Sequence, residues 1–124
     1  MKRTTWVAAL AAAALAGAAA GGAVAHDAVK GTTPARGAVL KNLPAKVSIT
    51  FSGPVGRLER VRITRNGKGD FVKAARIDPR NAARVIADVK RPGARHRKGV
   101  WRVTWRVTGV DGHTQVLKAS FRVR

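Results

Sequence analysis

The sequence contains no cysteine among its 124 residues. A disulfide framework and a thiolate metal site are therefore both excluded, and a fold outside the cytoplasm must be stabilised by packing alone. Any metal ion bound by the chain has to be held by nitrogen and oxygen atoms. The length suits one domain of ordinary size and leaves no room for two.

Acidic residues are also scarce, with six Asp and Glu against 25 Lys and Arg, which gives a formal net charge of +19. Such a field favours anionic partners and repels free cations at long range. Nucleic acid, anionic lipid head groups and acidic wall polymers all meet that description. The charge by itself does not choose among them.

Residues 1–25 have the composition of a secretory signal peptide. A short basic start precedes an apolar run rich in Ala and Leu, and the segment ends in Ala-Val-Ala. This combination predicts cleavage before His26, which becomes the first residue of one exported domain over residues 26–124. An uncleaved membrane anchor is the alternative, because the apolar run approaches the roughly 20 residues that span a bilayer.

Most of the remaining chain alternates between apolar and polar residues over short stretches, which is the period of a half-buried strand. Turn signals such as Asn66-Gly67 separate these stretches, and no stretch shows a helical period. Several short strands with regular turns predict an all-β chain that folds as an antiparallel β-sandwich. The predicted strands cover residues 46–52, 58–65, 71–77, 84–90, 101–108 and 117–124.

Much of the positive charge falls on the outward positions of these strands. A solvated basic face is the first interpretation, and a dedicated nucleic-acid surface is the alternative. The aromatic residues with strong periodicity point inward, so the chain lacks the row of exposed rings that a single-strand binder needs. We therefore expect no specific nucleic-acid partner. The outward basic residues are Arg60, Arg62, Arg102, Arg106, Lys118, Arg122 and Arg124.

A short polar corner, Val110 to Thr114, separates the two most strongly alternating stretches. Side chains two residues apart in an extended segment project from the same side, roughly 6–7 Å apart. Asp111 and His113 can therefore converge on one ion, with Gly112 allowing the backbone to bend between them. Taken alone this is a weak signal, because Asp-Gly is a common turn dipeptide and a loop histidine is usually solvated.

An amino-terminal His26 strengthens the metal hypothesis, because its α-amine and one imidazole nitrogen can close a chelate ring on one ion. The combined set is one amine, two imidazoles and one carboxylate. Tetragonal nitrogen and oxygen coordination favours Cu(II), which also leads Ni(II) and Zn(II) in the order of affinity. The third histidine, His96, lies among Arg95, Arg97 and Lys98 and is expected to be a solvated loop residue.

Five segments taken in order form a more specific pattern than any one of them. They are the signal-like segment followed at once by His26, Thr33-Pro34-Ala35, residues 49–55, residues 99–107 and Val110-Asp111-Gly112-His113. The pattern resembles the copper resistance protein CopC family. The resemblance implies an exported Greek-key antiparallel β-sandwich or barrel of the immunoglobulin-like type, which binds Cu(II) through His26, Asp111 and His113.

These observations together predict a non-enzymatic, monomeric protein that sequesters or carries copper ions in the periplasm or at the extracellular face of the cell envelope. It would contribute to copper resistance, with a membrane copper transporter as a candidate recipient. Some members of the family also hold Cu(I) at a methionine-rich segment. This chain has Met1 and no other methionine, so a thioether site is excluded from the mature domain.

Two other functions compete with this prediction. The first is a basic β-sandwich that binds anionic envelope polymers or membrane surfaces, with the polar corner serving only as a turn. The second is a copper oxidase, since an amino-terminal histidine chelate can also activate oxygen. Asp111 would occupy a position that such chemistry needs open, which argues against an enzyme.

Overall fold

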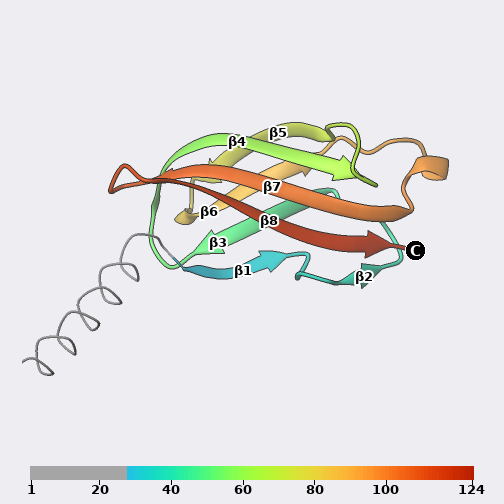
Figure 1. The fold of residues 1–124 in the computed structure, drawn as a ribbon, viewed down its shortest axis with the longest axis horizontal. Helices are drawn as coiled ribbons and strands as arrows, with labels where there is room; N and C mark the ends of the chain where they lie inside the picture. The colour runs from blue at the N-terminus through green and yellow to red at the C-terminus, as the bar shows by residue number, and fades with distance from the viewer. Residues whose placement is uncertain (1–27) are drawn as a thin grey trace, which may run out of the picture.

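The computed structural model describes residues 28–124 as two β-sheets packed face to face (Figure 1). Residues 1–27, which include the predicted signal peptide and His26, lie outside the described residues. The prediction of an all-β sandwich is confirmed. The strands are β1 (Val29–Thr33), β2 (Val39–Leu40), β3 (Lys46–Phe51), β4 (Val55–Arg65), β5 (Val72–Asp78), β6 (Asn81–Val89), β7 (Gly99–Gly109) and β8 (Thr114–Val123).

The chain crosses repeatedly between the two sheets. One sheet has the strand order β1-β3-β6-β5 and the other the order β2-β8-β7-β4. Neighbouring strands are antiparallel except β2 and β8, which pair in parallel at one edge and so depart from the expected antiparallel pattern. The ladder between β7 and β8 is continuous from Gly99↔Val123 to Thr108↔Thr114. The corner that joins these strands is therefore the end of a long regular hairpin.

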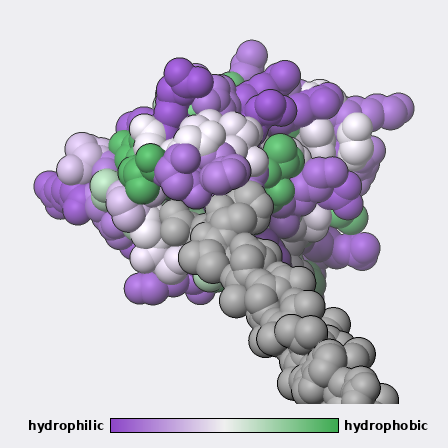
Figure 2. Space-filling model, turned by 60° about the vertical axis from the view of Figure 1, so that its left-hand side comes forward, coloured by the Kyte–Doolittle hydropathy of each residue, from purple (hydrophilic) through white to green (hydrophobic). Residues whose placement is uncertain are grey.

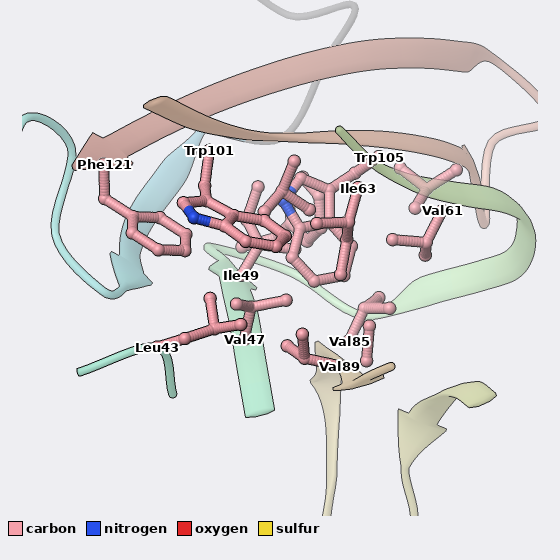
Figure 3. Packing of buried hydrophobic residues seen from close by; sticks show 14 of the residues in the cluster. Leu43, Val47, Ile49, Val61, Ile63, Val85, Val89, Trp101, Trp105 and Phe121 are labelled. Atoms are coloured by element: carbon pink, nitrogen blue, oxygen red, sulfur yellow. The ribbon is translucent and has the colours of Figure 1, made fainter. Parts of the chain in front are cut away.

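Strand alternation divides the side chains between the surface and the core. Polar residues cover most of the face seen in Figure 2, and apolar side chains from both sheets meet between the sheets in Figure 3. Trp101 and Trp105 are 0% and 1% exposed, which confirms the predicted inward face of β7. The ring of Phe71 meets that of Trp101 edge to face at a centroid distance of 5.0 Å. The core therefore fixes the position of β7, the strand that leads into the polar corner.

The Asn66-Gly67 turn forms as predicted, with φ angles of 50° and 80°. Two backbone hydrogen bonds of 3.0 Å join Arg65 and Lys68 across it. The flanking strands do not continue as a hairpin, because β4 and β5 belong to different sheets. In residues 28–124 no helix is long and apolar enough to cross a membrane. The basic loop, residues 90–98 between β6 and β7, holds a 3-10 turn, η1 (Ala94–His96).

Candidate metal centre

The polar corner connects Gly109, the last residue of β7, to Thr114, the first residue of β8. The Gly109 N–H donates to the carbonyl of His113 at 2.9 Å, and the Gly112 N–H donates to the carbonyl of Gly109 at 3.0 Å. Gly112 has a φ of 89°, in the left-handed region that glycine adopts without steric cost. The backbone of the corner is thus held by its own hydrogen bonds.

Asp111 and His113 lie side by side within this corner, as the sequence predicts. The Asp111 Oδ1 atom accepts the His113 backbone N–H at 3.0 Å, and its Oδ2 atom lies 3.0 Å from Nδ1 of the His113 imidazole. The His113 backbone N–H, and then the His113 side chain, lower the pKa of the Asp111 carboxyl below its ordinary value. The pair therefore combines an ionised carboxylate with an imidazole.

The carboxylate also decides which imidazole nitrogen is suited to bind a metal ion. An ionised carboxylate only accepts hydrogen bonds, so Nδ1 of a neutral His113 ring carries the proton. The lone pair of the ring then resides on Nε2. Carboxylates commonly orient metal-binding histidines in this way. Asp111 can thus act as an oxygen ligand or hold His113 in the tautomer that binds through Nε2.

Two glycines that the sequence analysis did not single out make room for this arrangement. A Cβ atom on Gly109 would lie 2.9 Å from Oδ1 of Asp111. A Cβ atom on Gly56 would lie 2.8 Å from the carbonyl oxygen of Gly109, where β4 approaches β7. A side chain at position 109 would push the carboxylate away, and one at position 56 would push the two strands apart.

A hydrogen-bonded cluster joins three strands at the base of the corner. The Thr108 hydroxyl donates to Oε2 of Glu59 at 2.7 Å and lies 2.9 Å from the hydroxyl of Thr114. Arg57 Nε donates to the same Glu59 oxygen at 2.8 Å. The Thr108 hydrogen bond, followed by that of Arg57, lowers the pKa of Glu59. The cluster ties β4, β7 and β8 together beside the two candidate ligands.

The first described residue, Ala28, is fixed at this same end of the sandwich. Its N–H donates to Oγ of Ser52 at 3.0 Å, and the Ser52 N–H donates to the Ala28 carbonyl at 2.8 Å. Ser52 leads into Val55, which pairs with Gly109 at the base of the corner. Figure 1 shows the start of β1 and the turn between β7 and β8 at the same side of the molecule.

The described residues supply two of the three predicted ligands. No group of three or more His, Cys, Asp and Glu side chains within residues 28–124 could hold a metal ion. His26 lies outside the described part of the chain. His96 lies before β7 while Asp111 and His113 follow it, so the eleven residues of that strand separate His96 from the corner.

Comparison with known proteins agrees with this architecture, a two-sheet β-sandwich with a carboxylate and an imidazole at one end. The CopC domain family matches residues 29–124. The chain therefore belongs to the CopC family, as the sequence resemblance predicts. Membership of this family also confirms the expectation that the protein is not an enzyme.

Three solved structures share the fold. CopC from Methylosinus trichosporium OB3b is 20% identical with a TM-score of 0.65, and the match covers 79% of this chain and 93% of that one. Selenomethionine PcoC, a copper resistance protein from Escherichia coli, is 17% identical with a TM-score of 0.64, covering 77% and 98%. PcoC described as a methionine-rich copper resistance protein from Escherichia coli is 22% identical with a TM-score of 0.61, covering 81% and 100%. No curated protein sequence matches the chain.

Proposed function

We propose that this protein binds Cu(II) at the polar corner through His26, Asp111 and His113, and contributes to copper resistance in the cell envelope. One observation carries the proposal. In a chain of the CopC family, the Asp111 carboxylate and the His113 imidazole lie 3.0 Å apart at the end of a regular hairpin. The solved structures of the same fold include copper resistance proteins.

The third ligand depends on export. Cleavage of a signal peptide over residues 1–25 would make His26 the amino terminus of the domain 26–124. His26 precedes Ala28 by two residues, and two residues span at most about 7 Å. The two hydrogen bonds between Ala28 and Ser52 fix the starting point of that span at the end of the sandwich that carries the corner. This anchoring supports a site shared by both ends of the sequence.

The donor atoms favour Cu(II) over other divalent ions. An amine, two imidazoles and a carboxylate suit tetragonal coordination, for which Cu(II) has the greatest affinity. The exported domain, without Lys2 and Arg3, has a formal net charge of +17 (19 minus 2), which repels cations, and the ionised Asp111 supplies a local negative charge at the proposed site. We expect the Greek-key, immunoglobulin-like domain to sequester or carry the ion in the periplasm or at the extracellular face, and to pass it to a membrane transporter.

The proposal is tested by titrating the exported protein with Cu(II) and recording electron paramagnetic resonance spectra. The amino-terminal residue is determined first, because the amine ligand requires His26 at that position. The wild-type protein should give a tetragonal, nitrogen-rich signal that His26→Ala and His113→Ala each change or abolish. His96→Ala is the matched control and should leave the signal unchanged. A spectrum unaltered by both ligand substitutions would contradict the proposal.

The same ligand set predicts a dependence on pH. The α-amine and both imidazoles must lose their protons before they can bind copper. Because protons compete with copper for these nitrogen atoms, affinity should fall as the pH drops below about 7. An affinity that stays constant between about pH 5 and pH 8 would argue against nitrogen ligands of this kind.

A further inference from the structure

The outer face of the β2-β8-β7-β4 sheet carries a second feature that copper binding does not explain. Six long basic side chains project from it, and all six residues are exposed. We call this surface the arginine face. Its residues are Arg60 and Arg62 on β4, Arg102 and Arg106 on β7, and Lys118 and Arg122 on β8.

Strand register brings some of these charges directly against each other. Arg60 on β4 is the cross-strand partner of Arg106 on β7. Like charges directly opposite each other in a sheet are destabilising. None of the six basic residues forms an ion pair with a carboxylate within residues 28–124. The repulsion therefore does not serve the stability of the domain.

On the opposite sheet, β1-β3-β6-β5, several exposed basic residues form ion pairs with carboxylates. Asp88 forms ion pairs with Lys46 at 2.7 Å and with Arg76 at 3.1 Å. Asp78 lies 3.8 Å from Arg84 in the same sheet. Asp78 and Asp88 thus compensate basic residues of that sheet. On the sheet of the arginine face, Glu59 is ion-paired with Arg57 at 2.8 Å and also attracts Arg106, but it forms no ion pair with any of the six residues, so the arginine face keeps most of its charge available to external anions.

Exposed valines lie among the basic residues of the arginine face. Val39, Val100 and Val116 are 58%, 40% and 51% exposed. Val100 and Val39 each pair with Arg122, and Val116 pairs with Arg106, so the valines alternate with the charges across neighbouring strands. A shallow hollow of about 180 Å³ lies among this face's residues Arg60, Arg62, Thr104, Arg106 and Val116.

We propose that the arginine face docks on a membrane surface of anionic phospholipid. Guanidinium groups form paired hydrogen bonds with phosphate, which matches the head groups of such a surface. The exposed valines favour a membrane over a soluble polyanion, because only a membrane offers apolar material behind its phosphates. Nucleic acid is disfavoured because Trp101 and Trp105 are buried and cannot stack on bases.

The test is co-sedimentation of the exported protein with vesicles. One set consists of phosphatidylcholine alone and the other of phosphatidylcholine and phosphatidylglycerol in equal parts. The protein should bind the anionic vesicles and not the neutral ones, and added salt should weaken the binding. Arg60→Gln/Arg106→Gln should bind roughly thirtyfold more weakly, since each basic side chain near such a surface adds attraction.

A matched double substitution separates the arginine face from net charge. Lys30→Gln/Lys73→Gln removes the same charge from exposed residues of the other sheet, neither of which forms an ion pair within residues 28–124, and should keep most of the binding. Equal losses in the two double variants would overturn the proposal, as would equal binding to neutral vesicles. Copper titration of Arg60→Gln/Arg106→Gln should match the wild type. The membrane-docking proposal and the copper-binding proposal can therefore be contradicted separately.

The valines distinguish a membrane from a soluble polyanion. Val116→Ser should weaken binding to the anionic vesicles, because it removes an apolar side chain from the contact. Inorganic polyphosphate provides the comparison, since it has phosphate charges without a hydrocarbon layer. Tight polyphosphate binding, together with vesicle binding that Val116→Ser leaves unchanged, would assign the arginine face to a soluble polyanion and overturn the proposal.

Discussion

The two loops at either end of β7 each carry an exposed histidine, yet they differ in what surrounds it. At the polar corner, the His113 imidazole lies 3.0 Å from the carboxylate of Asp111. In the basic loop, residues 90–98, His96 is flanked by Arg95 and Arg97. A cation is favoured at the first position and repelled at the second. The presence of a histidine therefore says little about metal binding, and the charge of the neighbouring residues determines whether a cation is attracted to it.

The two loops also differ in how they contact the core. The backbone carbonyl of Arg97 in the basic loop accepts a hydrogen bond of 2.8 Å from the indole N–H of Trp101. The side chain of Arg97 donates in turn to the Pro92 carbonyl at 2.7 Å. The polar corner contributes no buried residue, and its Val110 is 72% exposed. The basic loop contributes to the packing of the fold, whereas the corner is exposed and accessible to the proposed copper ion.

The largest expected effect comes from a substitution that removes the contact between the basic loop and the core, and it is an effect on the free energy of unfolding. Trp101→Ala should lower the free energy of unfolding by about 3–5 kcal/mol. The substitution opens a cavity in the core and removes the hydrogen bond from the indole N–H to the Arg97 carbonyl of the basic loop. Urea unfolding measures the loss. Val110→Ala in the polar corner is the control and should change stability by less than about 0.5 kcal/mol. Similar losses in the two variants would refute the division of roles.

Gly109→Ala should weaken copper binding while leaving the fold almost intact. The new Cβ atom would lie 2.9 Å from Oδ1 of Asp111 and would therefore displace that carboxylate. Misplacing a group that orients a metal ligand typically costs 10–100-fold in affinity, and about that loss is expected. Competition titration with a copper chelator measures it. Gly31→Ala, whose Cβ would meet nothing within 4 Å, should bind copper like the wild type.

A smaller effect on the free energy of unfolding is expected when the pH is lowered, because Glu59 at the base of the corner becomes protonated. The Thr108 hydrogen bond lowers the pKa of Glu59, so the folded state favours the ionised form. This contribution to stability is complete above the unfolded pKa of about 4.3 and is lost as the pH falls through the lower folded value. Wild-type stability should therefore drop more than that of Glu59→Gln between about pH 5 and pH 3. Parallel pH profiles in urea unfolding would contradict this role.

The smallest effect is expected from His96→Ala in the basic loop. Its exposed side chain makes no contact on which the fold depends, so stability should change by less than about 0.5 kcal/mol. Copper affinity, measured by the same competition titration, should stay within the error of the wild-type value. A loss of affinity would mean that the basic loop, despite its charge, participates in metal binding.

Alternation along the chain was sufficient to predict the strands that position the site. The inward row from Trp101 to Val107 and the outward row from Arg102 to Thr108 both agree with the structure, because β7 is regular and half-buried along its whole length. The two-residue strand β2 could not be predicted, since so short a segment has no period. Its parallel pairing with β8 is a tertiary contact that local pattern does not encode.

The candidate site was only partly predictable for similar reasons. Asp111 and His113 share a turn, so their spacing alone brings them together. The position of Glu59 beside the corner could not be predicted, because the register of β4 shifts between Leu58 and Arg60. This shift breaks the alternation from which the direction of the Glu59 side chain would be inferred. The role of Gly109 depends on the position of a carboxylate two residues later, which no pattern specifies. His26 remains a prediction.

The irregular edges of the two sheets affect how the domain meets other copies of itself at high concentration. The edge strands β1, β4 and β5 each contain a register shift, and the fourth edge strand, β2, has only two residues. A second copy of the chain therefore meets no long, straight row of unpaired backbone groups on which to add a strand. Irregular or very short edges of this kind disfavour edge-to-edge strand addition, the step by which sheets join into fibrils.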